Sequence, residues 1–151
     1  MITDDYLKLL NVYDKASRDR EVPAGFIYED YKSILKDSEE MGIFIEQKYP
    51  ETFVSHHHAQ DASYSVRTIV YRNELENSGP AWTLLYSNFG RMATIVPFQE
   101  TTTPPSFEEI ILKLEELEFK YIPYEILKRQ YQGVLDLPHN FTWWNRFFDE
   151  T

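Results

Sequence analysis

Three consecutive histidines, His56-His57-His58, are the residues of this sequence best suited to metal chemistry. In an extended chain His56 and His58 lie on the same side of the strand, as two ligands of one metal ion require. Asp61 or Glu51 can supply an oxygen ligand, but no residue is fixed by spacing as the third ligand of a catalytic zinc site. The alternative is a polar loop before the first strand, in which neighbouring imidazoles respond to pH between about 6 and 7.

Other motifs that carry chemistry are absent from the sequence. It contains no glycine-rich phosphate loop, no Gly-x-Ser-x-Gly and no His-Glu-x-x-His, and it has only 5 glycines. With no cysteine, disulfides, iron–sulfur clusters and cysteine-based zinc sites are excluded. We therefore expect no catalytic residues, no cofactor and no enzymatic activity.

The charge of the chain is strongly negative. It carries 25 acidic and 15 basic side chains, for a net charge of −10 and a pI near 4.8. Nucleic acids would be repelled by this field, because phosphate binding relies on clustered Lys and Arg. A basic protein would be attracted by it. The alternative is that the charge serves only to keep the protein dispersed in water.

Five of the 25 acidic side chains fall on one predicted helix, residues 107–118. Its apolar stripe consists of Phe107, Ile110, Ile111, Leu114 and Leu117. Its outer face carries Glu108, Glu109, Glu115, Glu116 and Glu118, with only Lys113 among them. Such a face is either simply solvated or a docking surface for a cationic partner. As candidate partner-binding residues we select Glu108, Glu115, Glu116 and Glu118.

The remaining elements follow from hydrophobic periodicity. Helical spacing predicts helices over residues 4–17 and 27–48. Gly42 disfavours helix and can end the second helix early. Alternation with period two predicts three strands, at residues 64–71, 82–86 and 92–98, and their short links favour an antiparallel meander. The inward arginines of such a sheet require acidic partners, so we interpret Arg67, Arg72 and Arg91 as structural.

The C-terminal third is predicted to contain short elements. Ser106 and Glu109 form a capping box for the acidic helix, and residues 119–122 are suited to a short edge strand. Pro123 can open a helix over 124–132 that Gly133 ends, and Thr142 can cap a last helix over 143–149. In that last helix Trp143 meets Phe147 and Trp144 meets Phe148. These rings either close the core or leave one ring exposed as a binding anchor.

Helices, then strands, then helices indicate an α+β fold. We expect one domain over residues 1–151, with a three-stranded or larger antiparallel sheet flanked by N- and C-terminal helices. The sequence shows no signal peptide and no apolar run of about 20 residues that could cross a membrane. We therefore expect a cytoplasmic protein without a membrane partner.

The last third of the chain resembles a known class of proteins. The pattern is a helix over 110–117, then Phe119-Lys120-Tyr121-Ile122-Pro123-Tyr124-Glu125, then Tyr131-Gln132-Gly133, and a closing run over 142–149. It is similar to the small bacterial immunity proteins that accompany polymorphic or contact-dependent toxins. The resemblance implies an acidic, cytoplasmic protein that binds one toxin domain tightly and catalyses nothing, and in which the aromatic motif marks the fold.

The function that we predict is therefore protein binding without catalysis, by an immunity protein that neutralises a cognate, basic toxin domain by occlusion. Two alternatives stay open. One is a small metal- or ligand-binding enzyme domain that uses His56 and His58, and the other is a regulatory adaptor.

Overall fold

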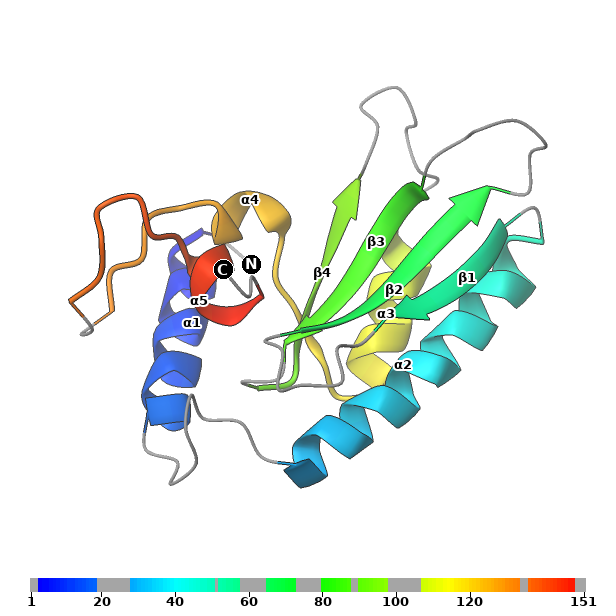
Figure 1. Ribbon diagram of the computed structural model, residues 1–151, viewed down its shortest axis with the longest axis horizontal. Coiled ribbons are helices and arrows are strands. Elements are labelled where there is room, and N and C mark those ends of the chain that lie inside the picture. Colours follow the sequence, from blue (N-terminus) through cyan, green and yellow to red (C-terminus); the bar gives the residue numbers. More distant parts are fainter. Residues whose placement is uncertain are drawn as a thin grey trace.

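The computed structural model describes residues 3–18, 28–50, 52–57, 65–72, 80–87, 90–97, 107–133 and 136–148. Five helices and one five-stranded sheet are found in this part of the chain (Figure 1). In chain order the elements are α1 (Thr3–Arg18), α2 (Tyr28–Lys48), β1 (Thr52–His57), β2 (Ser65–Arg72), β3 (Pro80–Ser87), β4 (Met92–Pro97), α3 (Glu108–Glu116), β5 (Lys120–Tyr121), α4 (Tyr124–Leu127) and α5 (Trp143–Phe147). The α+β class is confirmed, and no helix of the described residues has the length and apolar character needed to span a membrane.

The sheet has the order β1-β2-β3-β4-β5, and its first four strands form an antiparallel meander. The expected strands correspond to β2, β3 and β4. β1 was not expected: its pairing with β2 brings His56 opposite Thr68 and His57 opposite Arg67, so these two histidines belong to a strand and not to a loop. His58 lies outside the described residues.

The prediction of a purely antiparallel sheet was wrong, because β5 runs parallel to β4. Between these two strands the chain passes through α3, and a strand that follows such a helical crossover returns in the same direction. Backbone hydrogen bonds from Lys120 N to Arg91 O (2.7 Å) and from Ile122 N to Ala93 O (2.9 Å) fix the register. The short edge strand predicted over 119–122 is confirmed.

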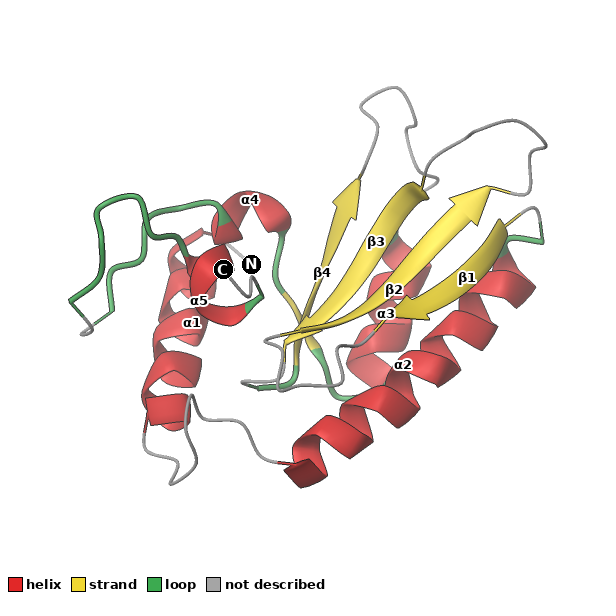
Figure 2. Cartoon of the chain, viewed as in Figure 1, coloured by secondary structure: helices red, strands yellow, loops and turns green. Residues whose placement is uncertain are grey.

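Helices α2 and α3 cover one face of the sheet, as Figure 2 shows. Their apolar side chains and those of alternate positions in β3 and β4 form a first core. Its members are Ile34, Met41, Ile45, Trp82, Leu84, Tyr86, Ala93, Ile95, Ile110, Leu114 and Phe119. Gly42 does not end α2 early: the helix continues to Lys48, because Met41 and Ile45 on either side of the glycine are fully buried.

A second core joins α1, α4 and α5 to the other side of β3 and β4. Leu85 and Met92 contribute from the sheet, because they alternate with the residues that face α2 and α3. The remaining buried members are Leu10, Ile122, Ile126, Leu127, Tyr131, Trp143, Phe147 and Phe148. Ser87 Oγ donates a hydrogen bond of 2.9 Å to the carbonyl oxygen of Phe147, which ties β3 directly to α5.

The aromatic end of the chain closes this second core. Thr142 caps α5 in a capping box with Asn145, as the sequence indicates for Thr142. Trp143 stacks on Phe147 at 6.0 Å between ring centroids, and Trp144 on Phe148 at 5.5 Å. Three of these four rings are fully buried, so the expectation that they close the core is confirmed.

α4 is shorter than the helix predicted over 124–132, since it ends at Leu127. Beyond it, the backbone at Gln130 pairs with Thr142, and Tyr131 N donates to Phe141 O at 2.8 Å. Gly133 packs against the ring end of Tyr131, where a Cβ atom would collide with it. Tertiary pairing therefore overrides the local helical preference here.

A buried ion pair fastens α1 to α5. Arg146 Nε donates to Asp14 Oδ1 at 2.7 Å, and Tyr131 Oη donates to Asp14 Oδ2 at 2.8 Å. The Asp14 side chain is only 2% exposed and that of Arg146 10%. A buried charge pair of this kind stabilises little relative to apolar residues, but loss of one partner leaves a buried charge without its counter-charge.

We expect Asp14→Ala to lower the free energy of unfolding by about 3–5 kcal/mol for this reason. Denaturant unfolding of Asp14→Ala, Arg146→Ala and the double variant measures the coupling, and the double variant should lose about 0.5–3 kcal/mol less than the sum of the single losses. The exposed pair Glu125–Lys128 (3.3 Å) is the control, with an expected coupling of at most about 0.5 kcal/mol. Additive losses at Asp14 and Arg146 would contradict the buried pair.

Burial raises the pKa of the Tyr86 hydroxyl far above its ordinary value of about 10, although the hydrogen bond donated by Thr68 (3.3 Å) lowers it. The unfolded chain therefore loses this proton at lower pH than the folded chain. The contribution of Tyr86 to stability is complete below pH of about 10 and is lost as the pH rises above it.

Above pH of about 10 we expect Tyr86 alone to reduce the unfolding free energy by up to about 1.4 kcal/mol per pH unit. Tyr86→Phe should remove this share of the slope, even though the variant loses a hydrogen bond at neutral pH. Urea unfolding of both proteins from pH 9 to 11 tests this, since other titrating groups cancel in the difference. Equal slopes in the two proteins would show that the Tyr86 hydroxyl ionises in the folded state.

Candidate functional site

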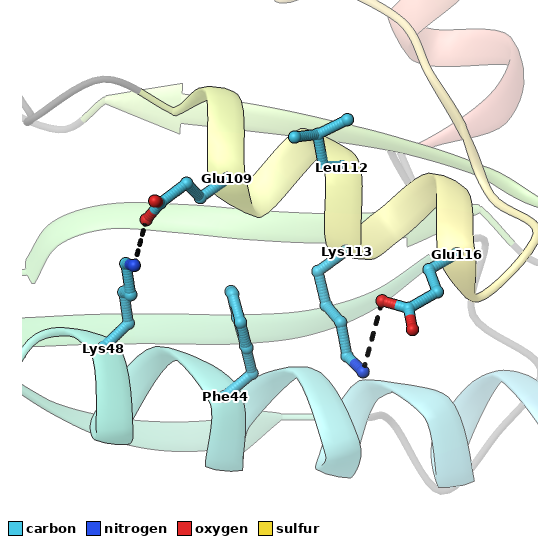
Figure 3. Close-up of a pocket in the computed structure, with 6 residues that line it drawn as sticks. All are labelled: Phe44, Lys48, Glu109, Leu112, Lys113 and Glu116. Carbon is cyan, nitrogen blue, oxygen red and sulfur yellow. Dashed lines mark ion pairs between the residues drawn. The ribbon is translucent and has the colours of Figure 1, made fainter.

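A shallow groove of about 250 Å³ lies between α2 and α3 on the side away from the sheet (Figure 3). Phe44 and Lys48 line it from α2, and Glu109, Leu112, Lys113 and Glu116 line it from α3. Pockets for small molecules usually measure about 300–1,000 Å³ and enclose most of the ligand. This groove is smaller and open, so its size suits one or two side chains of another protein.

The centre of the groove is apolar. Phe44 of α2 is partly buried and packs against the first core, whereas Leu112 of α3 is 63% exposed. The ammonium group of Lys113 lies 5.9 Å from the centroid of the Phe44 ring. Lys48 and Lys113 also present their aliphatic stems along this surface. The groove thus combines an apolar floor with charged ends.

Ion pairs stand at both ends of the groove, as Figure 3 shows. Lys48 Nζ lies 2.5 Å from Glu109 Oε2, whereas Lys113 Nζ is shared between Glu116 (3.7 Å) and Glu40 (3.8 Å). These carboxylates are 52–70% exposed, so each pair contributes at most about 1 kcal/mol. These ion pairs mainly determine the charge at the two ends of the groove and the orientation of the side chains that line it.

Arg91 holds the two helices in place from the sheet side. Its guanidinium donates to the Asp37 carboxylate and to Ser33 Oγ (3.2 Å) on α2, and to the carbonyl oxygen of Leu117 (2.5 Å) at the end of α3. It also lies 4.1 Å from the centroid of the Phe119 ring. The expectation that Arg91 is paired and structural is confirmed. The side chains of Arg67 and Arg72 are outside the described part.

The face formed by α2 and α3 is acidic. The two helices carry ten acidic and four basic side chains, a net charge of −6 within the −10 of the whole chain; of the acids, Asp37 binds Arg91 toward the sheet, and the side chains of Glu29 and Asp30 lie outside the described part. Glu108, Glu115, Glu116 and Glu118 are all exposed, but only Glu116 lines the groove. Glu109, which was not selected, also lines it and is paired with Lys48.

Sequence reasoning did not identify Phe44, Lys48 or Leu112 as site residues. One signal was available for Leu112, because it is the only leucine of residues 107–118 that falls off the apolar stripe. Phe44 and Lys48 gave no such signal, since their role depends on how α2 lies beside α3.

Metal binding by His56 and His58 stays a prediction. His56 and His57 are in β1, but the placement of their side chains is not described, nor is any part of His58. Within the described ranges, no group of three or more His, Asp or Glu side chains is arranged to hold a metal ion.

The end of α3 contains a backbone conformation that is unusual for its residue. Glu118 has a φ of 68°, the only positive φ of a non-glycine residue in the described part of the chain. Phe119 N donates to Leu114 O (2.9 Å) and Glu118 N donates to Glu115 O (2.9 Å), which is the Schellman pattern of a helix end. Glycine usually occupies the left-handed position of this pattern. Ser106, which the sequence predicts as a cap at the other end of α3, lies outside the described residues, and the N-cap residue Phe107 makes no side-chain hydrogen bond.

Comparison of the chain with protein-family models, with curated proteins and with solved structures found no match.

We expect Glu118→Gly to raise the free energy of unfolding by about 0.5–1 kcal/mol. The left-handed conformation costs a residue with a Cβ atom about 1–2 kcal/mol, and the greater freedom of glycine in the unfolded chain offsets part of this gain. Glu115→Gly, within the helix, makes the same chemical change and should lower stability by about 1 kcal/mol. Thermal or urea unfolding distinguishes the two. A loss of stability in both variants would mean that the Glu118 side chain has a stabilising role.

Proposed function

We propose that this chain is a non-catalytic protein-binding module that covers a basic surface of a protein partner with the acidic face of α2 and α3. The observation that carries the proposal is the composition of that face: a groove with an apolar centre and a lysine–glutamate pair at each end, on two helices whose net charge is −6. Interfaces commonly have an apolar centre and a polar rim, and charges of one sign on the rim steer a partner of the opposite sign.

The face is well suited to occlusion because its two helices are fixed to each other. Arg91 joins α2 to the end of α3, and both helices are anchored through the first core. A preorganised surface loses little conformational freedom on binding, so more of the interaction energy appears as affinity. The net charge of −10 accelerates the encounter with a basic partner.

Glu118 supports the same proposal independently. A glutamate occupies a left-handed position that favours glycine. Backbone strain of this kind is often retained where the side chain is needed for function. We therefore place Glu118 in the docking face together with Glu108, Glu115 and Glu116.

For the identity of the partner we propose a bacterial toxin domain, so that the chain acts as an immunity protein in the cytoplasm. The support is the resemblance of its last third to that class. Toxin domains that attack nucleic acids have positive active sites, because they must bind phosphate. An acidic cover would fit such a site and prevent substrate from entering. An adaptor in another complex would bind a partner without protecting cells, so protection separates these two functions.

We expect co-expression of the chain to protect cells from the toxin encoded beside its gene, measured as viable counts. The variant Glu115→Lys/Glu116→Lys should lose protection, and its association rate constant with the purified toxin domain should fall about ten-fold or more at low salt. Glu125→Lys/Asp136→Lys changes the net charge equally, at exposed positions outside α2 and α3, and should retain protection.

Two results would reject the proposal. If the wild-type chain neither binds the toxin domain nor protects cells, the partner is wrong. If both double variants reduce the association rate equally, the net charge matters and the acidic face does not.

A further inference from the structure

We infer that the groove between α2 and α3 is an anchor site for a basic amphipathic helix of the partner, which inserts one apolar side chain against Phe44 and Leu112. This inference rests on the proposed function and assigns its point of contact. Helices often bind in a groove between two other helices by laying their apolar side into it.

Leu112 is the first reason. It is 63% exposed on a helix whose other apolar side chains face the core or its edge, and it lines the groove from α3 while the partly buried Phe44 lines it from α2 (Figure 3). A single exposed leucine needs no explanation by itself. Here it lines a groove that Phe44 lines as well, so an apolar side chain of a partner can be buried there against both.

Size and charge decide the kind of occupant. A groove of about 250 Å³ holds one or two side chains and is too small and open for a typical metabolite. A second copy of this chain would bring another net charge of −10 to an acidic face, so like charges oppose self-association. A helix that carries Lys or Arg beside an apolar residue fits both the small size of the groove and the negative charge of the face.

The ion pairs at the ends of the groove show where the basic groups of that helix would lie. Lys113 is divided between two carboxylates, Glu116 at 3.7 Å and Glu40 at 3.8 Å, and both distances exceed hydrogen-bond range. The Lys113 ammonium group is therefore near two exposed carboxylates but hydrogen-bonded to neither. A basic side chain of the partner can complete this set, whereas Lys48 and Glu109 at the other end are already closely paired at 2.5 Å.

The test uses three synthetic peptides of about four helical turns each. The first contains leucine and lysine, with the leucines on one helical face. The second replaces each leucine by alanine and keeps the charge, and the third replaces each lysine by glutamate. Calorimetry measures their dissociation constants with the full chain, and NMR titration of the isotope-labelled chain locates the contact.

We expect the leucine–lysine peptide to bind with the largest shifts at Phe44, Leu112 and Lys113. The alanine–lysine peptide should bind about ten-fold or more weakly, because it leaves the groove empty. Leu112→Ala should weaken the first peptide by a similar factor. Val12→Ala is the matched control: Val12 is 64% exposed, lies on α1, and should leave the affinity unchanged.

If the two lysine peptides bind equally tightly, or if Leu112→Ala has no effect, the anchor site is rejected while an acidic docking face remains. If the leucine–glutamate peptide binds as tightly as the leucine–lysine peptide, the choice of a basic partner fails, and the proposed function fails with it. If no peptide binds, the anchor site is rejected, and protection by the chain then decides the proposed function separately. Circular dichroism of each variant confirms that it remains folded.

Discussion

One guanidinium group bonds to both α2 and α3 and ties their positions to the sheet that they share. Arg91 leaves the sheet at the start of β4 and reaches Asp37 and Ser33 on one helix and the carbonyl of Leu117 at the end of the other, over the ring of Phe119. Only arginine offers several fixed donors on a planar cation that also stacks on an aromatic ring. This contact ties the two helices together beneath the groove, while the ion pairs Lys48–Glu109 and Lys113–Glu40 join them at its surface.

The two sides of the sheet differ in where their charged residues lie. On the side of α1 and α5, the charged residues Asp14 and Arg146 are buried and form an ion pair. The aromatic residues of α5 pack into the second core on the same side. On the side of α2 and α3, the charges lie at the surface and are mostly acidic. A buried pair fixes one arrangement of the chain, whereas exposed carboxylates remain available to another molecule.

Local patterns predicted the elements well where packing agreed with them. The alternation in β2 to β4, the apolar stripes of α2 and α3, and the Thr142 cap of α5 each follow from a few neighbouring residues. The failures depend on distant contacts. The sequence of β1 is partly polar, and the segment forms a strand because β2 pairs with it. β5 is parallel to β4 because the chain passes through α3 between them. α4 ends early because Gln130 pairs with Thr142. For the same reason the acidity of α3 was predictable from the sequence, but the groove beside Phe44 was not.

Charge and shape contribute to recognition in different ways at such a face. Exposed ion pairs add little affinity and are screened over about 8–10 Å at ordinary salt concentrations, so the carboxylates mainly accelerate the encounter. They also attract every basic protein, which means that they cannot select one partner. Selection then requires a feature that depends on fit. In the described part of the face, the groove between Phe44 and Leu112 is such a feature, because an apolar side chain of the wrong size would leave it unfilled or fail to enter.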